Sequence, residues 1–459
     1  MNDKMDGWTW KSADAEEAEA PPPTNRQWVV PRRSPAESAR AAAAWFRAEW
    51  IKLTTVLVVI ALAIGGWQTY TYLTRYHEQT SGPHGDFPAA LGSGAPLRPD
   101  RVQARLGSPP VGIVGGLLLK ERNDGITADN VRTGKEYWHY GREDTALITE
   151  WVSNDTAFLW YEDGLAVAVN LHSGKPRWHA EVPGSTRDSG NRVWVSGDTL
   201  FVSRTDQLTA LSTRGGKRLW SVAPPKGCKA WDQRTLVGLD GVEAIDANDC
   251  SRDSEHAEVL FGVDPATGST RWHVDEEAIG YRRLGAHTLA TLTLGGALIT
   301  TDVSGAEPRT RETPLSHDVT PRGAGRSDGL LLLGSDENRS LTGRQVSADS
   351  SSKALWTRKA SKGLEFGIPR TTDGRVYVAQ YRTPMAIRRN GGSGTAHLLV
   401  LDARTGHELH RTALPASLYD HVDDLALDQM SIVEAKYGIV TVGWIGDLVN
   451  SAAQAVLAE

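Results

Sequence analysis

The stretch VDPATGSTRW (Val263–Trp272) joins a tight turn to a tryptophan, and it decides how this chain is interpreted. Asp264 can accept backbone N–H groups two or three residues further on, and Pro265 presets the φ angle of the next turn position. Gly268 suits the left-handed conformation that a type I turn with a glycine bulge requires. With the apolar residues that precede it, this stretch predicts a β-hairpin.

Six related stretches occur elsewhere: DNVRTGKEYW (Asp129–Trp138), VNLHSGKPRW (Val169–Trp178), LSTRGGKRLW (Leu211–Trp220), TTDVSGAEPR (Thr300–Arg309), VSADSSSKALW (Val346–Trp356) and LDARTGHELH (Leu401–His410). The repeated turn residues, with Asp402 placed like Asp264, are Gly134, Gly174, Gly216, Gly268, Gly305, Ser352 and Gly406. Their mean spacing of about 45 residues is typical of four-stranded propeller blades.

The repeat predicts an all-β propeller. Each unit has apolar strands, then the turn, then the strand that carries the tryptophan, and one such sheet cannot bury both of its faces alone. Stacked radially, each repeated tryptophan can wedge against the next blade. We therefore interpret five tryptophans as packing residues rather than ligand contacts: Trp138, Trp178, Trp220, Trp272 and Trp356.

This A-x-D-x-x-T-G-x-x-x-W pattern resembles the PQQ-like (pyrroloquinoline-quinone-like) β-propeller repeat family over about three quarters of the chain. The family includes quinoprotein dehydrogenases, propeller lipoproteins of outer-membrane assembly and sensor ectodomains of bacterial membrane proteins; only the dehydrogenases are enzymes. The dehydrogenases carry adjacent cysteines over their cofactor, whereas Cys228 and Cys250 lie 22 positions apart. No acidic set here matches a Ca²⁺ site of that kind. We expect the scaffold without catalytic, cofactor-binding or metal residues.

The number of blades depends on how the two ends of the repeat region meet. RVQARL (Arg101–Leu106) precedes a first blade that is already complete, and Met430–Glu459 reads as the first strands of a further blade. Joining these ends closes an eighth blade, so that the predicted propeller spans residues 101–459. We expect eight blades, with seven as the alternative.

A different element precedes the repeats, in LTTVLVVIALAIGGWQTYTYL (Leu53–Leu73), which carries no charge. Its length of about 30 Å as a helix matches a bilayer core, so residues 51–74 predict a transmembrane signal-anchor helix. Basic residues are concentrated before the span, which places the N-terminus in the cytoplasm and the propeller outside the plasma membrane. The spacing Ala61-x-x-x-Gly65 is a weak indication of helix pairing in a homodimer.

The segments on either side of the span have compositions that do not bury a core. Residues 1–50 are acidic, then proline-rich and basic, and predict a largely disordered cytoplasmic tail that ends in a helix starting at Ser34 and Pro35. Residues 75–100 are rich in Gly, Pro and Ser and predict a flexible linker.

Cys228 and Cys250 are the two cysteines of the chain, and they fall in an enlarged repeat. In an oxidising compartment we expect them to form a disulfide that braces this blade, with two buried thiols as the alternative. HELH (His407–His410) lies on a predicted strand and lacks the spacing of a zinc motif. The net charge of −6 argues against nucleic acid as a partner.

The expected function is that of a single-pass membrane protein whose extracytoplasmic propeller binds a protein or a cell-envelope ligand. Two alternatives stay open. One is a PQQ-dependent oxidoreductase with an atypical site. The other is an extracytoplasmic sensor, although no output domain is recognisable in the first fifty residues.

Overall fold

The structure is a computed structural model of the 459-residue chain. It describes residues 34–36, 39–40, 43, 45–46, 50, 52, 54–62, 76–106, 110–182, 192–248, 250, 259–275, 279–293, 297–305, 307–315, 319–324, 329–335, 337–347, 352–390, 394–420, 429–445 and 454–459. The chain divides into two compact units, Met1–Tyr72 and Leu73–Glu459.

In the first unit, every described residue from Pro35 to Leu62 is helical, and Ser34 stands directly before the helix. Thr54 Oγ1 donates a hydrogen bond to the carbonyl oxygen of Trp50, at 2.7 Å. In the part of the chain that the structure describes, no helix is long and apolar enough to cross a membrane. Residues 1–33 of the predicted tail, and residues 51, 53 and 63–74 of the predicted span with Gly65 among them, lie outside the described residues.

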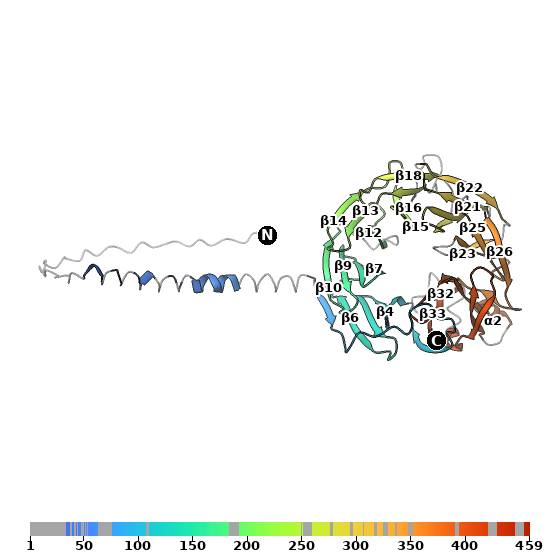
Figure 1. Cartoon of the computed structure of the whole chain (residues 1–459), viewed down its shortest axis with the longest axis horizontal. Helices are drawn as coiled ribbons and strands as arrows, with labels where there is room; N and C mark the ends of the chain where they lie inside the picture. The colour runs from blue at the N-terminus through green and yellow to red at the C-terminus, as the bar shows by residue number, and fades with distance from the viewer. Residues whose placement is uncertain are drawn as a thin grey trace, which may run out of the picture. The chain divides into compact units, whose positions relative to one another are not determined.

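The second unit is a β-propeller of eight antiparallel sheets, so the prediction of eight blades is confirmed. Figure 1 shows the blades arranged in chain order around a central axis. Blade 1 contains β3 (Pro110–Val114), β4 (Leu117–Arg122), β5 (Gly125–Asn130) and β6 (Glu136–Arg142), and blade 2 contains β7 (Leu147–Ser153), β8 (Thr156–Tyr161), β9 (Leu165–Asn170) and β10 (Pro176–Glu181). Blade 3 contains β11 (Arg192–Ser196), β12 (Thr199–Ser203), β13 (Leu208–Ser212) and β14 (Arg218–Val222), and blade 4 contains β15 (Ala230–Leu239), β16 (Val242–Asn248), β17 (Val259–Val263) and β18 (Thr270–Asp275).

The remaining blades vary more in their strands. Blade 5 contains β19 (Ile279–Arg283), β20 (Thr288–Leu292), β21 (Ala297–Asp302) and β22 (Arg309–Pro314), and blade 6 contains β23 (Thr320–Ala324), β24 (Leu330–Ser335), β25 (Ser340–Val346) and β26 (Ser352–Lys359). In blade 7, β27 (Glu365–Phe366) and β28 (Arg370–Thr372) both pair with β29 (Arg375–Tyr381), which is followed by β30 (Ala396–Asp402) and β31 (Glu408–Ala413). Blade 8 contains β32 (Gln429–Lys436), β33 (Ile439–Ile445), β34 (Gln454–Ala458) and β2 (Arg101–Leu106). Blade 7 also carries helix α2 (Pro384–Asn390), and the 3-10 helix η1 (Ala416–Tyr419) follows its last strand.

The eighth blade joins the two ends of the repeat region. Its three inner strands come from the end of the chain, and β2 pairs antiparallel with β34 as its outer strand, with Arg101 opposite Ala458 and Leu106 opposite Gln454. The predicted closure of the ring is therefore confirmed. Each of the eight sheets thus packs against two neighbours through apolar side chains.

The core is divided into eight apolar clusters, one at each interface between consecutive blades. We call these interfaces seams and number them by their blades. Strands β8 and β9 are almost continuously buried, because a blade is covered on both faces by its neighbours. Every seam thus depends on side chains from two repeats.

Residues 76–100 are an integral part of the propeller, and the prediction of a flexible linker is wrong for them. We call this segment the strap. Its strand β1 (Glu78–Ser81) adds a fifth strand to blade 1 by pairing with β6. Further on, Gly92 N–H donates to the carbonyl of Tyr437 in blade 8, and Tyr377 of blade 7 donates its hydroxyl to the carbonyl of Pro96. The Gly/Pro composition reflects close approach to the hairpins, where Gly92 lies against Gly438.

Candidate binding surfaces

The repeated tryptophan contacts the repeated turn of the next blade. At seam 1/2, Trp138 is fully buried and its Nε1 donates to the carbonyl oxygen of Leu171, at 2.7 Å. Gly174 has φ +65°, and a Cβ at this position would lie 2.9 Å from the Trp138 ring. Glycine is therefore required both for the left-handed turn and for the ring that packs on it. We call this arrangement the Trp–turn contact.

The same contact occurs at three further seams. Trp178 donates to Thr213 at seam 2/3, Trp220 to Pro265 at seam 3/4, and Trp356 to Ala403 at seam 6/7, with distances of 2.8, 3.0 and 2.9 Å. The turn glycines Gly216, Gly268 and Gly406 lie against these rings with positive φ. The side chain of Asp264 closes its turn by accepting the N–H groups of Ala266 and Thr267.

The two seams of blade 5 lack the complete contact. Trp272 is 6% exposed, yet its Nε1 has no hydrogen-bond partner among the residues that the structure describes. The turn that it faces is altered, because Gly305 does not adopt a positive φ and strands β21 and β22 pair without the bulge found in blades 1–4. In blade 1, Trp138 pairs with Ala128 across the last two strands. In blade 5, the equivalent pair is Thr300 with Arg311, so that seam 5/6 has an exposed arginine in place of the tryptophan. In blade 6, Ser352 aligns in sequence with the turn glycines, but it is the first residue of strand β26 and pairs with Val346.

At seam 7/8 the strap takes the place of a turn. His410 stands four residues after Gly406, where other blades have tryptophan. Its Nε2 lies 2.6 Å from Asp100 Oδ1, and the Thr412 hydroxyl donates to the same oxygen at 2.5 Å. These hydrogen bonds lower the pKa of Asp100 below its ordinary value. His410 thus fastens the strap to blade 7 and is not part of a metal motif.

A buried polar cluster connects the start of the strap to blades 1 and 2. Glu78 Oε1 accepts the hydroxyl of Tyr140 at 2.6 Å and lies 2.5 Å from His179 Nε2. Burial raises the pKa of Glu78, but these two hydrogen bonds outweigh it and hold the pKa below its ordinary value. Tyr76 stacks on the His179 ring at 4.1 Å, and Arg142 donates to the carbonyl of Tyr76. The first described residues of the second unit are therefore firmly anchored.

A second titratable group lies on the inner strands. Glu150 is on β7 of blade 2, and burial together with the neighbouring carboxylate of Glu121 raises its pKa to about 7. Burial also raises the pKa of Glu121, whereas Arg192 on β11 partly offsets the effect at Glu150. Composition alone did not reveal this pair, because it forms between strands of different repeats.

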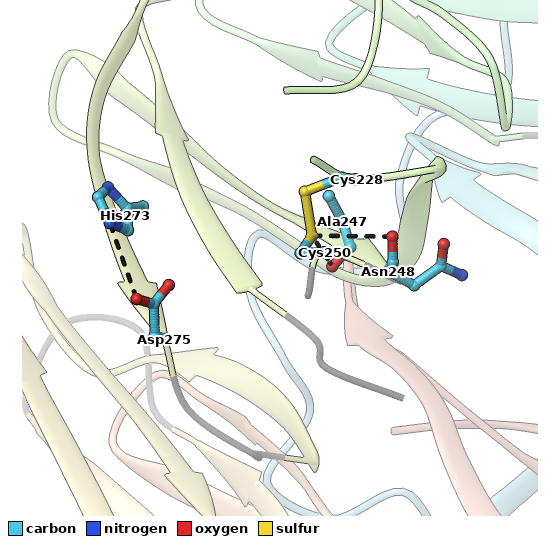
Figure 2. The surroundings of a disulfide bond; sticks show 6 residues. All are labelled: Cys228, Ala247, Asn248, Cys250, His273 and Asp275. Carbon is cyan, nitrogen blue, oxygen red and sulfur yellow. Dashed lines mark hydrogen bonds and ion pairs between the residues drawn. A yellow bond between two sulfur atoms is a disulfide. The ribbon is translucent and has the colours of Figure 1, made fainter. Parts of the chain in front are cut away.

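Cys228 and Cys250 form a disulfide with an S–S distance of 2.11 Å (Figure 2). The bond joins the connection between β14 and β15 to the residues after β16, and Cys250 Sγ lies 3.4 Å from the carbonyl oxygen of Ala247. The predicted pairing within the enlarged repeat is confirmed, and it places the bond in blade 4. The cysteines are not adjacent in sequence, so they do not reproduce the vicinal pair of a quinoprotein.

Among the described residues, no group of three or more His, Cys, Asp and Glu side chains is placed to hold a metal ion. The repeat turns and tryptophans lie at the seams rather than in one common site. The features that sequence reasoning missed are the strap, the Glu78 cluster and the Glu121–Glu150 pair. The missing tryptophan in TTDVSGAEPR was the available signal for the unusual seams of blade 5.

A family model described as the outer membrane protein assembly factor BamB matches residues 93–249 and 255–433. The two matched ranges cover most of the propeller on both sides of the Cys250 loop. No curated protein sequence matches the chain.

Among solved structures, the computationally designed Ika8 protein has a TM-score of 0.51 and 12% identity, covering 82% of this chain and 100% of its own. This likeness shows a shared fold and no more. BamB from Moraxella catarrhalis has a TM-score of 0.49 and 11% identity over 78% of this chain and 99% of its own. The quinohemoprotein alcohol dehydrogenase from Comamonas testosteroni has a TM-score of 0.43 and 12% identity, over 83% of this chain and 76% of its own.

Proposed function

Because this chain belongs to the family of the outer membrane protein assembly factor BamB, we propose that its propeller is a binding or scaffold module for a protein or cell-envelope ligand. The observation that carries the proposal is the family match over residues 93–249 and 255–433. The disulfide adds support, since it commits both cysteines of the chain to bracing blade 4.

The proposal includes a membrane anchor. Leu53–Leu73 is uncharged and long enough to span a bilayer, with basic residues concentrated before it. The N-terminus then lies in the cytoplasm and the propeller outside the plasma membrane, where the disulfide is stable. We include in the same proposal a weak homodimer through Ala61 and Gly65.

Thiol labelling of intact cells tests the topology. The variant Lys362→Cys places a thiol on an exposed turn of the propeller, and Ser12→Cys places one in the predicted tail. The natural cysteines give no background, because they are paired. A membrane-impermeant maleimide should label Lys362→Cys and leave Ser12→Cys unlabelled until the cells are opened. The opposite pattern would refute the anchor orientation.

Site-specific photocrosslinking on intact membranes tests the binding role. A photoreactive residue at exposed turn positions of the propeller should give discrete crosslinked products, and the destabilising substitution Trp138→Ala should abolish them. In parallel, purified full-length protein is incubated with PQQ and Ca²⁺ and assayed with primary alcohols and an artificial electron acceptor. We expect no quinone-dependent turnover. Turnover that requires both additions, without crosslinked partners, would replace the scaffold by the enzyme.

A further inference from the structure

The repeated turns of blades 1, 2 and 3 share a second feature besides the glycine. In each of them a lysine directly follows the turn glycine, as Gly134–Lys135, Gly174–Lys175 and Gly216–Lys217. All three lysine side chains are exposed. Among the residues that the structure describes, none of the three ammonium groups has a hydrogen-bond or ion-pair partner. We call these three residues the lysine row.

The fold places the lysine row along one arc of the ring. Blades 1, 2 and 3 follow one another (Figure 1), and the turn between the third and fourth strands lies at the same end of each sheet. The ring of Trp138 lies against Gly174 of the next turn, and the ring of Trp178 lies against Gly216 in the same way. Since packed sheets lie about 10 Å apart, successive ammonium groups stand at intervals on the order of 10 Å.

Carboxylates at the same end of these blades do not neutralise the lysine row. Asp155 and Asp198, in the first hairpins of blades 2 and 3, each accept an arginine of their own blade, at 2.5 and 2.6 Å. In blade 1, Glu136 accepts a serine hydroxyl of the strap and lies 2.8 Å from a histidine Nδ1 of its own strand. The exposed Asp86 and Arg132 carry opposite charges. In a chain of net charge −6, this arc therefore keeps an excess of positive charge.

The turn itself does not require a lysine after its glycine. In blade 4 the equivalent residue is Ser269, which is exposed as the lysines are. Gly268 before it has φ +74°, close to the values of +65° and +66° at Gly174 and Gly216. The same turn thus forms with a neutral side chain, so that folding does not explain the three charges.

We propose that the lysine row binds a linear, phosphate-bearing polymer of the cell envelope, with one negative charge on each repeating unit. The proposal rests on the proposed binding function and names its ligand. Lysine binds phosphate as a point charge, so the row tolerates a flexible ligand that follows the curve of the ring. A protein partner would be anchored chiefly by aromatic or apolar side chains, and the row itself offers none.

Fluorescence anisotropy of labelled poly(glycerol phosphate) tests the proposal, with the full-length protein in micelles of an uncharged detergent. We expect saturable binding that weakens with salt. The slope of log K against log salt concentration should be about −2, because three phosphates are held and each releases its counterions.

Replacing Lys135, Lys175 and Lys217 together by glutamine should weaken binding roughly 10-fold, as expected for three exposed ion pairs. The salt slope should approach zero. The melting temperature should stay that of the parent, because the three side chains are exposed on the turns and do not lie in a seam.

The matched control replaces Lys226, Lys359 and Lys362 together by glutamine. These lysines are also exposed, but they lie at the other end of the blades, where one blade passes into the next. This variant loses the same charge and should bind the polymer with the affinity and the salt slope of the parent. If the two triple variants bind alike, the proposal is wrong.

A gain of binding provides a test that loss of folding cannot imitate. Ser269→Lys extends the lysine row into blade 4 and should tighten binding about two- to fivefold, the range for one exposed ion pair. Unchanged affinity would contradict a ligand that runs along the turns.

Competition at equal charge concentration identifies the class of ligand. Poly-L-glutamate, polygalacturonate and a single-stranded oligonucleotide should each displace the probe less well than unlabelled poly(glycerol phosphate). Equal or better competition by any of them would refute the proposal, as would the absence of saturable binding. Photocrosslinks that persist in the variant without the lysine row would then leave the general binding role standing, so the two proposals can fail separately.

Discussion

Seams 1/2 and 5/6 join blades of the same topology, yet they are built differently. Seam 1/2 has a buried tryptophan, a glycine turn with positive φ and a hydrogen bond between them. Seam 5/6 has an exposed arginine in register with that tryptophan, and a cavity lined by both blades. The ring nevertheless closes through both, because apolar strands on the two sides bury each other. The Trp–turn contact therefore strengthens a seam but is not required to form one.

The largest expected loss of stability comes from removing a tryptophan, and it should be larger at a complete Trp–turn contact than at an incomplete one. Trp178 and Trp272 are 7% and 6% exposed, and of the two only Trp178 has a hydrogen-bond acceptor among the residues that the structure describes. Trp178→Ala should lower the free energy of unfolding by about 4–5 kcal/mol through the cavity that it leaves. Trp272→Ala should cost about 1 kcal/mol less, the usual net value of one hydrogen bond. Urea unfolding of both variants measures the difference, and a larger loss for Trp272→Ala would contradict the distinction between the seams.

The disulfide should have the next largest effect, and it braces the blade that faces the incomplete seam 4/5. Replacing Cys228 and Cys250 together by serine should destabilise the protein by about 3 kcal/mol, because the bond closes a loop of 22 residues in the unfolded chain. The variant should melt earlier and keep the photocrosslinks of the parent. Titration of the unfolded, unreduced parent should find no thiol; two thiols would show that the bond does not form.

A complete seam also contains a destabilising pair, which a pH series can reveal. The pKa of Glu150 is raised to about 7 in the folded protein, above the ordinary value of 4.5. Folding therefore favours the protonated carboxyl of Glu150. The resulting stabilisation of the folded protein is complete below pH 4.5 and is lost as the pH rises through 7. Glu150→Gln should thus match the parent near pH 4.5 and be more stable at pH 8, by about 1–2 kcal/mol after screening.

The control for this series is Glu143→Gln, an acid outside that pair on the surface of the same region. The effect of Glu150→Gln is compared with that of Glu143→Gln at each pH, so that the part specific to the pair is isolated. A pH-independent difference for Glu150→Gln would mean that this carboxyl ionises normally.

The smallest expected effect concerns the strap at seam 7/8. Asp100 is exposed, so Asp100→Asn should cost less than about 1 kcal/mol at pH 7. The hydrogen bonds from Thr412 and His410 lower the pKa of Asp100, so their stabilisation is present above its ordinary value and is lost as the pH falls. Melting curves at pH 7 and pH 3 should show the variant approaching the parent in acid. A difference that grows in acid would contradict this role.

Most of the ring could be predicted from the sequence, because its strands repeat one pattern at one spacing. The turn at Asp264–Gly268 carries its own conformational signals, and the match between Arg101–Leu106 and the unfinished last blade was enough to predict closure. The strap could not be predicted in this way. Its backbone bonds to the first hairpin of blade 1 and to hairpins of blades 7 and 8 that are remote in sequence, and its Gly and Pro residues have no periodicity. The cavity at seam 5/6 also depends on the course of two turns rather than on composition.

Ring closure by β2 and β34 determines when the fold can be completed during synthesis. Arg101 is made early but pairs with Ala458, 357 positions later. Until the last strand is available, β2 has no hydrogen-bonding partner in its sheet, and the faces of blades 1 and 7 that meet blade 8 remain uncovered. Contacts of such high sequence separation form slowly, and unpaired strand edges invite association with other chains. The growing chain therefore passes through an open ring, in which β1 of the strap can already pair with β6 of blade 1 while β2 still awaits β34.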